Sequence, residues 1–271
     1  MKEELIRLAF EEDLQDVGDV TSQAIFGEEE ATYKLFAKDD GILCGAELFK
    51  DVFLYLDNQI KFKFYFEDGN NIFTGDLIAE ISGKVLSILQ AERVALNFLS
   101  NLSAVATKTN KFVQVAAGKC KILDTRKTLP GYRKLQKYAV KCGGGTNHRL
   151  GLFDMVMIKD NHHDAAGGIT KAVDMVRKQW SDRYKIEVET RNLAEVEEAL
   201  ACNVDVIMLD NMSNEQMREC VKVIAGKAQV EASGNMTLER IDAVADTGVD
   251  FISIGELTHT IKAFDFSLRK N

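Results

Sequence analysis

The residues best suited to chemistry in this chain are cations in the stretch from Lys119 to Arg149. That stretch holds nine lysines and arginines and one acid, Asp124, so it carries +8 while the rest of the chain carries −16. Within it, Arg126 and Lys127 directly follow an apolar run. Adjacent Arg and Lys offer a bidentate fork and a point charge, which suit a carboxylate and a phosphate together. An acidic chain with so concentrated a basic stretch is expected to bind a small polyanion.

A glycine-rich segment, GGGTNHR (143–149), follows most of these cations. It fits neither the P-loop nor the dinucleotide fingerprint, so it does not predict nucleotide binding through those motifs. Its glycines allow a sharp turn or the close approach of a ligand to the backbone. His148 and Arg149 at its end, with Asn161 and His162 further on, favour a binding site over isolated structural histidines. The histidine and cysteine spacings match no zinc motif.

Three lysines of the basic stretch are predicted to have no part in the site. Lys134, Lys137 and Lys141 recur at spacings of three and four residues. That spacing is typical of the solvated face of a helix. The anion site is therefore expected from other residues of the stretch.

The second half of the chain alternates short apolar runs with amphipathic segments, which predicts parallel β/α units. Asn192 with Glu195, and Ser213 with Gln216, have the spacing of a helix cap and its reciprocal partner. Periodicity alone does not decide between a barrel and an open doubly wound sheet, but in both folds ligands bind at the carboxyl ends of the strands. Those ends are expected at Asp124, Lys159, Glu189, Asp210, Ser233 and Gly255.

The charged residues at these ends allow several roles. Lys159 could be a snorkelling side chain, an anchor for a carboxylate, or the nucleophile of a Schiff-base aldolase. Glu189 and Asp210 could hold Mg²⁺, sugar hydroxyls or a cationic transition state, or pair with Lys127 or Lys159. The last two strands are each followed by a loop of the kind that binds phosphate in barrels. These loops are residues 231–235 and 253–257.

The first half predicts different elements. Apolar spacing indicates a helix over 3–14, strands over 33–45 and 59–66, and a long helix from Val85 to Ala117. The length of that helix suits a connector between two domains, and we expect a break within it.

Composition excludes several classes of protein. The chain has 271 residues, 46% hydrophobic and 28% charged, with a net charge of −8. These values argue against disorder, and against nucleic acid or membrane as the main partner. The amino terminus carries acids where a signal peptide would need an apolar core. Five scattered cysteines with no C-x-x-C pair fit a reducing compartment, so a cytoplasmic location is expected.

Motifs along nearly the whole chain resemble the quinolinate phosphoribosyltransferase family, also called carboxylating nicotinate-nucleotide pyrophosphorylases. They are EEDLQDVGDVTS (11–22), FEDGN (66–70), AERVALNFLSNLSAVAT (91–107), DTRKTLPGYR (124–133), KYAVKCGGGTNHRLGLFDMVMIKDNH (137–162), EVE (187–189), LDN (209–211), EASG (231–234) and GVDFISIGELTH (248–259). The resemblance implies the type II phosphoribosyltransferase fold. In it, an N-terminal α/β sandwich (1–103, joined by the tail 262–271) is followed by an incomplete α/β barrel of six or seven strands (104–261). It also implies a homodimer, or a higher oligomer, in which each active site includes residues of the neighbouring subunit.

The activity implied by the resemblance belongs to de novo NAD biosynthesis. Quinolinate and phosphoribosyl pyrophosphate give nicotinate mononucleotide, pyrophosphate and CO₂, with Mg²⁺ and without nicotinamide, flavin or zinc. The residues implied around the two carboxylates of quinolinate are Arg93, Arg126, His148, Arg149 and Lys159. Those implied beside phosphoribosyl pyrophosphate are Lys127, Glu189, Asp210, Ser233, Gly234 and Gly255. Of these, Lys127, Glu189 and Asp210 are the implied catalytic residues. Glu189 and Asp210 are also the implied Mg²⁺ ligands, directly or through substrate or water.

Two residues depart from the family pattern, and three rival interpretations compete with it. Ala104 and Asn235 stand where the family commonly has glycine, which questions local backbone detail. One rival is a paralogue of the same fold, associated with molybdate-uptake operons, that acts on another substrate. Another is a Schiff-base aldolase that uses Lys159. The third is a non-catalytic module that binds an anion or a nucleic acid.

Overall fold

The computed structural model describes residues 2–270, which form two compact units. One unit comprises the chain up to Lys108 together with the chain from Ile261 onward, and the other is Thr109–Thr260. Within residues 2–270, no helix has the length and apolar character needed to cross a membrane.

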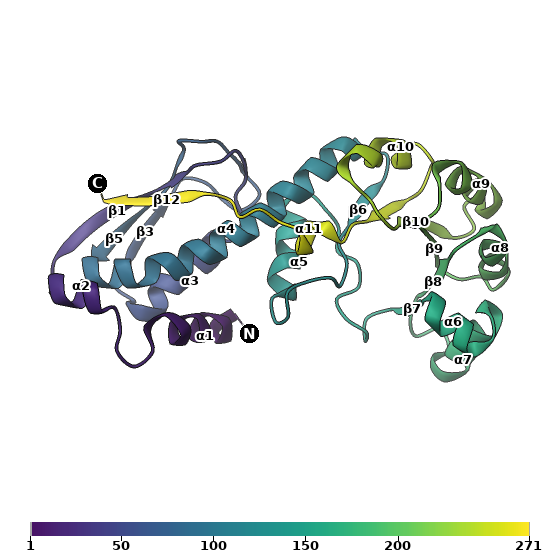
Figure 1. Ribbon diagram of the computed structural model, residues 1–271, viewed down its shortest axis with the longest axis horizontal. Coiled ribbons are helices and arrows are strands. Elements are labelled where there is room, and N and C mark those ends of the chain that lie inside the picture. Colours follow the sequence, from purple (N-terminus) through teal and green to yellow (C-terminus); the bar gives the residue numbers. More distant parts are fainter. Residues whose placement is uncertain (1, 271) are drawn as a thin grey trace. The chain divides into compact units, whose positions relative to one another are not determined.

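The first unit is built on an antiparallel sheet with strand order β12-β1-β5-β3 (Figure 1). Its strands are β1 (Glu30–Ala37), β3 (Lys61–Phe64), β5 (Leu77–Lys84) and β12 (Phe266–Lys270), with a small pair of β2 (Gly41–Ile42) and β4 (Asn71–Ile72). Its shorter helices are α1 (Lys2–Leu14), α2 (Val20–Ile25) and α3 (Ala46–Leu56). α3 buries an apolar face, and its Phe53 ring lies 5.6 Å from Phe62 of β3, so helix and sheet share one core.

The long helix α4 (Val85–Ala116) runs without interruption, so the predicted break is wrong. The stretch contains neither proline nor glycine, the residues that most often end or kink a helix. Its apolar residues Leu99, Leu102 and Ala106 are buried, as their spacing predicts.

The second unit contains six parallel strands in the order β6-β11-β10-β9-β8-β7 (Figure 1). They are β6 (Lys121–Leu123), β7 (Val156–Ile158), β8 (Ile186–Thr190), β9 (Val206–Asp210), β10 (Gln229–Ser233) and β11 (Phe251–Ser253). From β7 to β11 each strand lies beside the next in the chain, and β6 pairs with β11. This winding in one direction is that of a barrel, whereas a doubly wound sheet reverses its order.

The barrel is incomplete, because β6 and β7 do not pair with each other within the described residues. The edge of β6 that does not pair with β11 is bridged instead by the glycine-rich segment. Thr146 forms a parallel bridge with Leu123, and its N–H donates to the carbonyl of Ile122 at 2.8 Å. The predicted incomplete α/β barrel is confirmed, with six strands.

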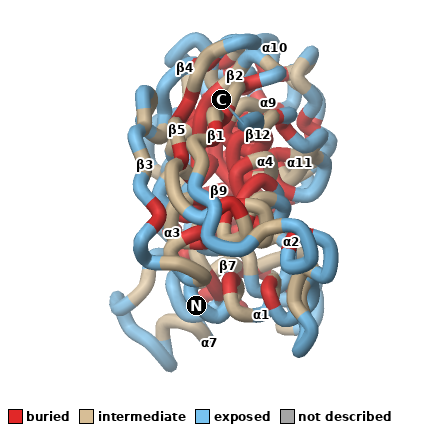
Figure 2. Tube along the Cα trace, turned by 90° about the vertical axis from the view of Figure 1, so that its left-hand side faces the viewer, coloured by how far each residue is buried: buried red, intermediate tan, exposed pale blue. Residues whose placement is uncertain are grey.

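Helices follow the strands of this unit, and their caps agree with the sequence. They are α5 (Arg133–Cys142), α6 (Asp160–Ala166), α7 (Ile169–Trp180), α8 (Leu193–Ala201), α9 (Asn214–Ile224), α10 (Ile241–Ala245), α11 (Glu256–His259) and the 3₁₀ turn η1 (Leu238–Arg240). Asn192 Oδ1 accepts the N–H of Glu195 at 3.1 Å, and Ser213 and Gln216 form a reciprocal capping box. Both caps are confirmed, but the reciprocal bond forms only at Ser213, because Glu195 accepts the N–H of Arg191 at 2.7 Å instead of that of Asn192. Buried positions concentrate on the strands, while exposed ones follow loops and outer helix faces (Figure 2).

Candidate active site

The six residues expected at strand ends lie along one rim of the barrel unit, because parallel strands all point the same way. Asp124 follows β6, Lys159 follows β7, and Gly255 lies two residues beyond the end of β11. Glu189 lies near the end of β8, while Asp210 and Ser233 are the last residues of β9 and β10. The sheet therefore brings side chains together that are far apart in the sequence.

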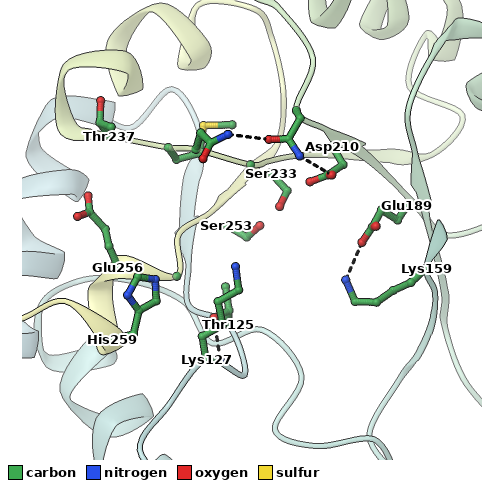
Figure 3. A pocket seen from close by; sticks show the side chains of 15 residues that line it. Thr125, Lys127, Lys159, Glu189, Asp210, Ser233, Thr237, Ser253, Glu256 and His259 are labelled. Carbon is green, nitrogen blue, oxygen red and sulfur yellow. Dashed lines mark hydrogen bonds and ion pairs between the residues drawn. The ribbon is translucent and has the colours of Figure 1, made fainter. Parts of the chain in front are cut away.

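A polar pocket of about 570 Å³ opens on this rim (Figure 3). Its lining includes every residue expected beside phosphoribosyl pyrophosphate, namely Lys127, Glu189, Asp210, Ser233, Gly234 and Gly255. The side chain of Lys127 points into the space between Lys159 on one side and Ser253 on the other (Figure 3). Positively charged, carboxylate and hydroxyl side chains thus all face the same pocket.

A second pocket of about 310 Å³ adjoins the first. Four of the five cations expected around a dicarboxylate line it, namely Arg126, His148, Arg149 and Lys159. Met157 and Met208 add apolar surface against which a flat ring can pack. The two pockets share Thr125, Lys127, Lys159, Ser233 and Ser253, so ligands in them would be in contact.

The fifth expected cation, Arg93, belongs to the first unit. It lies on α4 with its side chain exposed, as does Asn97 one turn later. It lines neither of the two pockets.

Lys159 and Glu189 form an ion pair across the rim. The ammonium of Lys159 donates to Glu189 Oε2 at 2.6 Å, with the lysine side chain 45% exposed and the glutamate 9% exposed. The possible pairing of these two residues is therefore confirmed. Because the lysine is so exposed, the pair contributes little to stability, and an anionic ligand can compete with Glu189 for Lys159.

His162 positions Lys159 rather than lining a pocket. Its Nδ1 accepts the backbone N–H of Lys159 at 2.9 Å, at the start of α6. The Asn161–His162 pair that sequence reasoning associated with a binding site is absent from the lining of both pockets.

His148 lies between two buried carboxylates. Its Nε2 is 3.2 Å from Glu187 Oε2 and 3.3 Å from Glu231 Oε2, and both glutamates are almost fully buried. Burial alone would lower the pKa of His148, but the two carboxylates raise it to about 10. The backbone N–H of Arg149 points at Nδ1 at 2.7 Å, which favours the neutral ring protonated on Nε2 and opposes that rise. In either state a proton remains on Nε2, facing the carboxylates.

The protein provides hydrogen-bond acceptors for only some of the N–H groups of the two arginines in the second pocket. Arg149 donates to the carbonyl of Met155 at 3.2 Å and to the sulfur of Met157 at 3.4 Å. Burial and the nearby charge of Arg126 lower its pKa. The Nε of Arg126 is buried without a hydrogen-bond partner among the described residues. An anionic ligand would offset the repulsion between the two arginines and could accept a hydrogen bond from the Nε of Arg126.

The loop after β10 explains one departure from the family pattern. Gly234 has a φ of +94°, and a Cβ there would lie 2.2 Å from Asn211 Oδ1, so only glycine fits. Asn235 also adopts a left-handed φ, of 48°. Asparagine tolerates this conformation better than most residues, so the loop accepts it where glycine is frequent.

Sequence reasoning missed Glu187 and Glu231, although a signal for them existed. Side chains two residues apart in a strand point to the same face. Glu187 precedes Glu189 by two residues on β8, and Glu231 precedes Ser233 by two on β10. Once Glu189 and Ser233 are assigned to the site, Glu187 and Glu231 can be predicted to point to the same face of the sheet.

The prediction for Lys137 is wrong. Lys134 and Lys141 are exposed, but the side chain of Lys137 is only 2% exposed and is paired with the fully buried Asp124. The helix α5 buries Gln136, Lys137, Ala139 and Val140. Of the three lysines spaced along this helix, Lys137 therefore lies on the buried face.

Two carboxylates of the larger pocket suit a magnesium ion. Mg²⁺ is usually held by one or two carboxylates, with waters and substrate phosphates completing its shell. Glu189 and Asp210 provide such oxygens beside a polar space, where Asp210 Oδ2 also accepts the side-chain N–H of Asn211 at 2.7 Å. The donor set therefore fits an ion that enters with a phosphorylated substrate.

Comparison with known proteins agrees with this arrangement. The chain is 43% identical to the probable nicotinate-nucleotide pyrophosphorylase (carboxylating) of Bacillus subtilis, covering 94% of this chain and 89% of that protein. It is 44% identical to quinolinate phosphoribosyltransferase (decarboxylating) 1b of Nicotiana tabacum, covering 98% of this chain and 81% of the relative. The crystal structure of NadC from Streptococcus pyogenes matches it with a TM-score of 0.96 at 41% identity, covering 99% and 96% of the two chains.

Family profiles cover both units. Residues 19–103 match the quinolinate phosphoribosyl transferase N-terminal domain, and residues 105–269 match the C-terminal domain. With both domains matched in order along nearly its whole length, the chain belongs to the quinolinate phosphoribosyltransferase family.

Proposed function

We propose that the protein is a decarboxylating quinolinate phosphoribosyltransferase. It would convert quinolinate and phosphoribosyl pyrophosphate into nicotinate mononucleotide, pyrophosphate and CO₂, as a step of NAD biosynthesis. The observation that carries the proposal is the pair of adjoining pockets. One is lined by five cationic side chains, Lys127 among them, and by two methionines, and the other by carboxylates, hydroxyl groups and lysines.

Quinolinate fits the smaller pocket by charge and shape. It is a flat dianion, and Arg126, Arg149 and Lys159 can each donate charge-assisted hydrogen bonds to its carboxylates. His148, held by Glu187 and Glu231, forms part of the same wall. When a carboxylate takes Lys159, Glu189 loses its ion-pair partner and faces the larger pocket with its charge uncompensated.

Phosphoribosyl pyrophosphate fits the larger pocket. Ser233, Gly234 and Gly255 would receive the 5-phosphate, and Lys127 the pyrophosphate. Bound Mg²⁺ would neutralise phosphate charge, with Glu189 and Asp210 as its protein ligands, directly or through water. When pyrophosphate leaves, the ribosyl carbon becomes positively charged, and Glu189 and Asp210 stabilise that charge from fixed positions.

The loss of CO₂ follows from the first step. Attack by the pyridine nitrogen makes the ring cationic, so the ring accepts the electron pair released when the bond to the adjacent carboxylate breaks. The ring carbon then takes a proton. For this step the chain must orient that carboxylate and exclude water, which the arginines and the methionine surface of the smaller pocket can do.

The direct test is an assay of the purified protein. Incubation with quinolinate, phosphoribosyl pyrophosphate and Mg²⁺ should yield nicotinate mononucleotide and CO₂ in equal amounts. Formation of neither product would refute the proposed reaction and favour a paralogue with another substrate.

Substitution of Lys159 separates a carboxylate anchor from a Schiff-base nucleophile. Lys159→Arg should keep partial quinolinate binding, whereas Lys159→Ala should weaken binding roughly tenfold to a hundredfold, because a charge-assisted hydrogen bond worth ~1.5–3 kcal/mol is lost. Titration calorimetry measures both affinities. Mass spectrometry after borohydride treatment serves as the control, since covalent modification of Lys159 by substrate would contradict the anchor role and support an aldolase.

We also propose a cytoplasmic homodimer in which Arg93 reaches the partner subunit's substrate. The exposed placement of Arg93 and Asn97 on one face of α4 leaves that arginine available to another copy of the chain. The five cysteines form no disulfide within residues 2–270, which suits a reducing compartment.

Mixed dimers test this arrangement. Arg93→Ala and Lys159→Ala should each have little activity alone at a limiting quinolinate concentration, but a heterodimer should contain one site with both defects and one with neither. Activity should therefore recover towards one intact site per heterodimer after the two variants are dissociated and reassociated. Heterodimers identified by native mass spectrometry that stay as inactive as the parents would exclude a role for Arg93 across the interface.

A further inference from the structure

The least accessible ion pair near the candidate site lies behind the substrate-facing residues. It joins Asp124, which follows β6, to Lys137 of α5, with side chains 0% and 2% exposed. Neither residue lines either of the two adjoining pockets. The reaction proposed above gives neither of them a role.

Asp124 and Lys137 both hydrogen-bond the backbone of one residue, His148. The N–H of His148 donates to Asp124 Oδ1 at 2.9 Å, and the ammonium of Lys137 donates to the carbonyl of His148 at 2.9 Å. The side-chain amide of Asn147, oriented to satisfy its neighbours, donates to Asp124 Oδ2 and to the carbonyl of Lys137, both at 2.9 Å. The segment that carries His148 and Arg149 is thus fixed by its main chain.

The charges of this pair depend on each other. Burial raises the pKa of Asp124 and lowers that of Lys137, and in each case the partner's opposite charge works against the effect of burial. A buried pair is seldom the most stable solution, because apolar residues of similar volume often serve as well. Apolar residues, however, could not hydrogen-bond the N–H and carbonyl of His148.

The segment that carries His148 and Arg149 must be placed precisely, because it presents two side chains to the smaller pocket. Backbone bonds to Asp124 and Lys137 set the direction in which the side chains of His148 and Arg149 leave the chain. Both side chains line the pocket of about 310 Å³. Because β6 and β7 are unpaired here, this segment is joined to β6 by the isolated bridge between Thr146 and Leu123 rather than by a regular strand of its own.

We infer that Asp124 and Lys137 are positioning residues that fix the His148–Arg149 segment, so that Arg149 meets a carboxylate of the ligand and His148 keeps its place in the pocket wall. The identity of that ligand as quinolinate rests on the proposed function.

The test replaces Lys137 with an apolar residue of similar length. Lys137→Met should raise the KM for quinolinate about 10- to 100-fold, because small displacements of a binding group cost that much, while the KM for phosphoribosyl pyrophosphate stays within about twofold. Lys134→Met provides the matched control, since it removes an exposed lysine from the same helix one turn earlier. It should leave both constants unchanged.

A double variant separates positioning from stability. Lys137→Met alone leaves Asp124 buried without its partner and should lower Tm, whereas Asp124→Leu/Lys137→Met should recover part of that loss. The quinolinate KM should stay high in both variants, because both lack the hydrogen bond from Lys137 to the carbonyl of His148. A quinolinate KM that follows Tm, or that rises together with the KM for the second substrate, would overturn the inference.

Hydrogen exchange tests the placement without any turnover. In Lys137→Met, the amides of residues 146–150 should exchange at least about tenfold faster, because the bond from Lys137 to the carbonyl of His148 is missing and Asp124, which accepts the N–H of His148, has lost its partner. The strands β8 to β10 should keep their protection. Unchanged exchange in 146–150 would overturn the inference. If the unaltered protein fails to convert quinolinate, the proposed reaction is wrong, and the exchange result still decides whether this pair holds the segment.

Discussion

Nicotinate, which has one carboxylate where quinolinate has two, is expected to be used roughly a hundredfold to ten-thousandfold less efficiently than quinolinate. With the second carboxylate missing, about two charge-assisted hydrogen bonds worth ~1.5–3 kcal/mol each are lost. The affected cations, Arg126, Arg149 and Lys159, line one small pocket, and the Nε of Arg126 is buried without a hydrogen-bond partner among residues 2–270. Steady-state kinetics with both substrates at saturating phosphoribosyl pyrophosphate measures the ratio of kcat/KM.

Phthalate is the matched control for this experiment. It keeps two adjacent carboxylates on a flat ring but has no ring nitrogen to attack the ribosyl carbon. It should therefore compete with quinolinate, with an affinity similar to that of the substrate, and give no product. Comparable kcat/KM values for nicotinate and quinolinate would contradict the assignment of the smaller pocket to a dicarboxylate.

Asp210→Asn is expected to lower kcat at least about a hundredfold. The change keeps the size of the side chain but removes a negative charge, and losing one preorganised electrostatic contact to a transition state typically costs 10²- to 10³-fold. Asp210 lines the larger pocket but not the smaller one, so the KM for quinolinate should change little. Initial rates with each substrate varied in turn separate the two constants.

Glu219→Gln is the control for the loss of charge. Glu219 is an exposed carboxylate on α9, in the same unit as Asp210 and outside both pocket linings. Its removal should leave kcat unchanged within about twofold, as expected for surface substitutions. If Asp210→Asn retains the kcat of the unaltered protein, the developing positive charge is stabilised by other groups.

The strand-end residues of the barrel unit could be predicted from sequence because they follow a simple rule. Each parallel strand is a short, mostly apolar run, and the polar residue at its carboxyl end lies at the rim. This reasoning located Lys159, Glu189, Asp210 and Ser233 correctly at the rim of the sheet. The choice of a barrel over a doubly wound sheet depended on strand order, which pairing between distant segments decides.

Features that depend on tertiary packing were harder to predict. Periodicity placed Lys137 on a solvated face, but pairing with Asp124 from another element allows a buried charge. The break expected in α4 is absent, although the helix passes from one unit into the other between Lys108 and Thr109. Which atoms of His148 face Glu187 and Glu231 depends on the side-chain rotamer and on the curvature of the sheet.

The opening of the barrel between β6 and β7 has a consequence for how this protein can evolve. An unpaired strand edge invites association with other chains, and here the glycine-rich segment covers part of the edge of β6 through Thr146. Two residues later, the same segment presents His148 and Arg149 to the pocket. A mutation that loosens this segment would therefore reduce ligand recognition and solubility together. Selection against aggregation would preserve the segment even in a descendant that had changed its substrate.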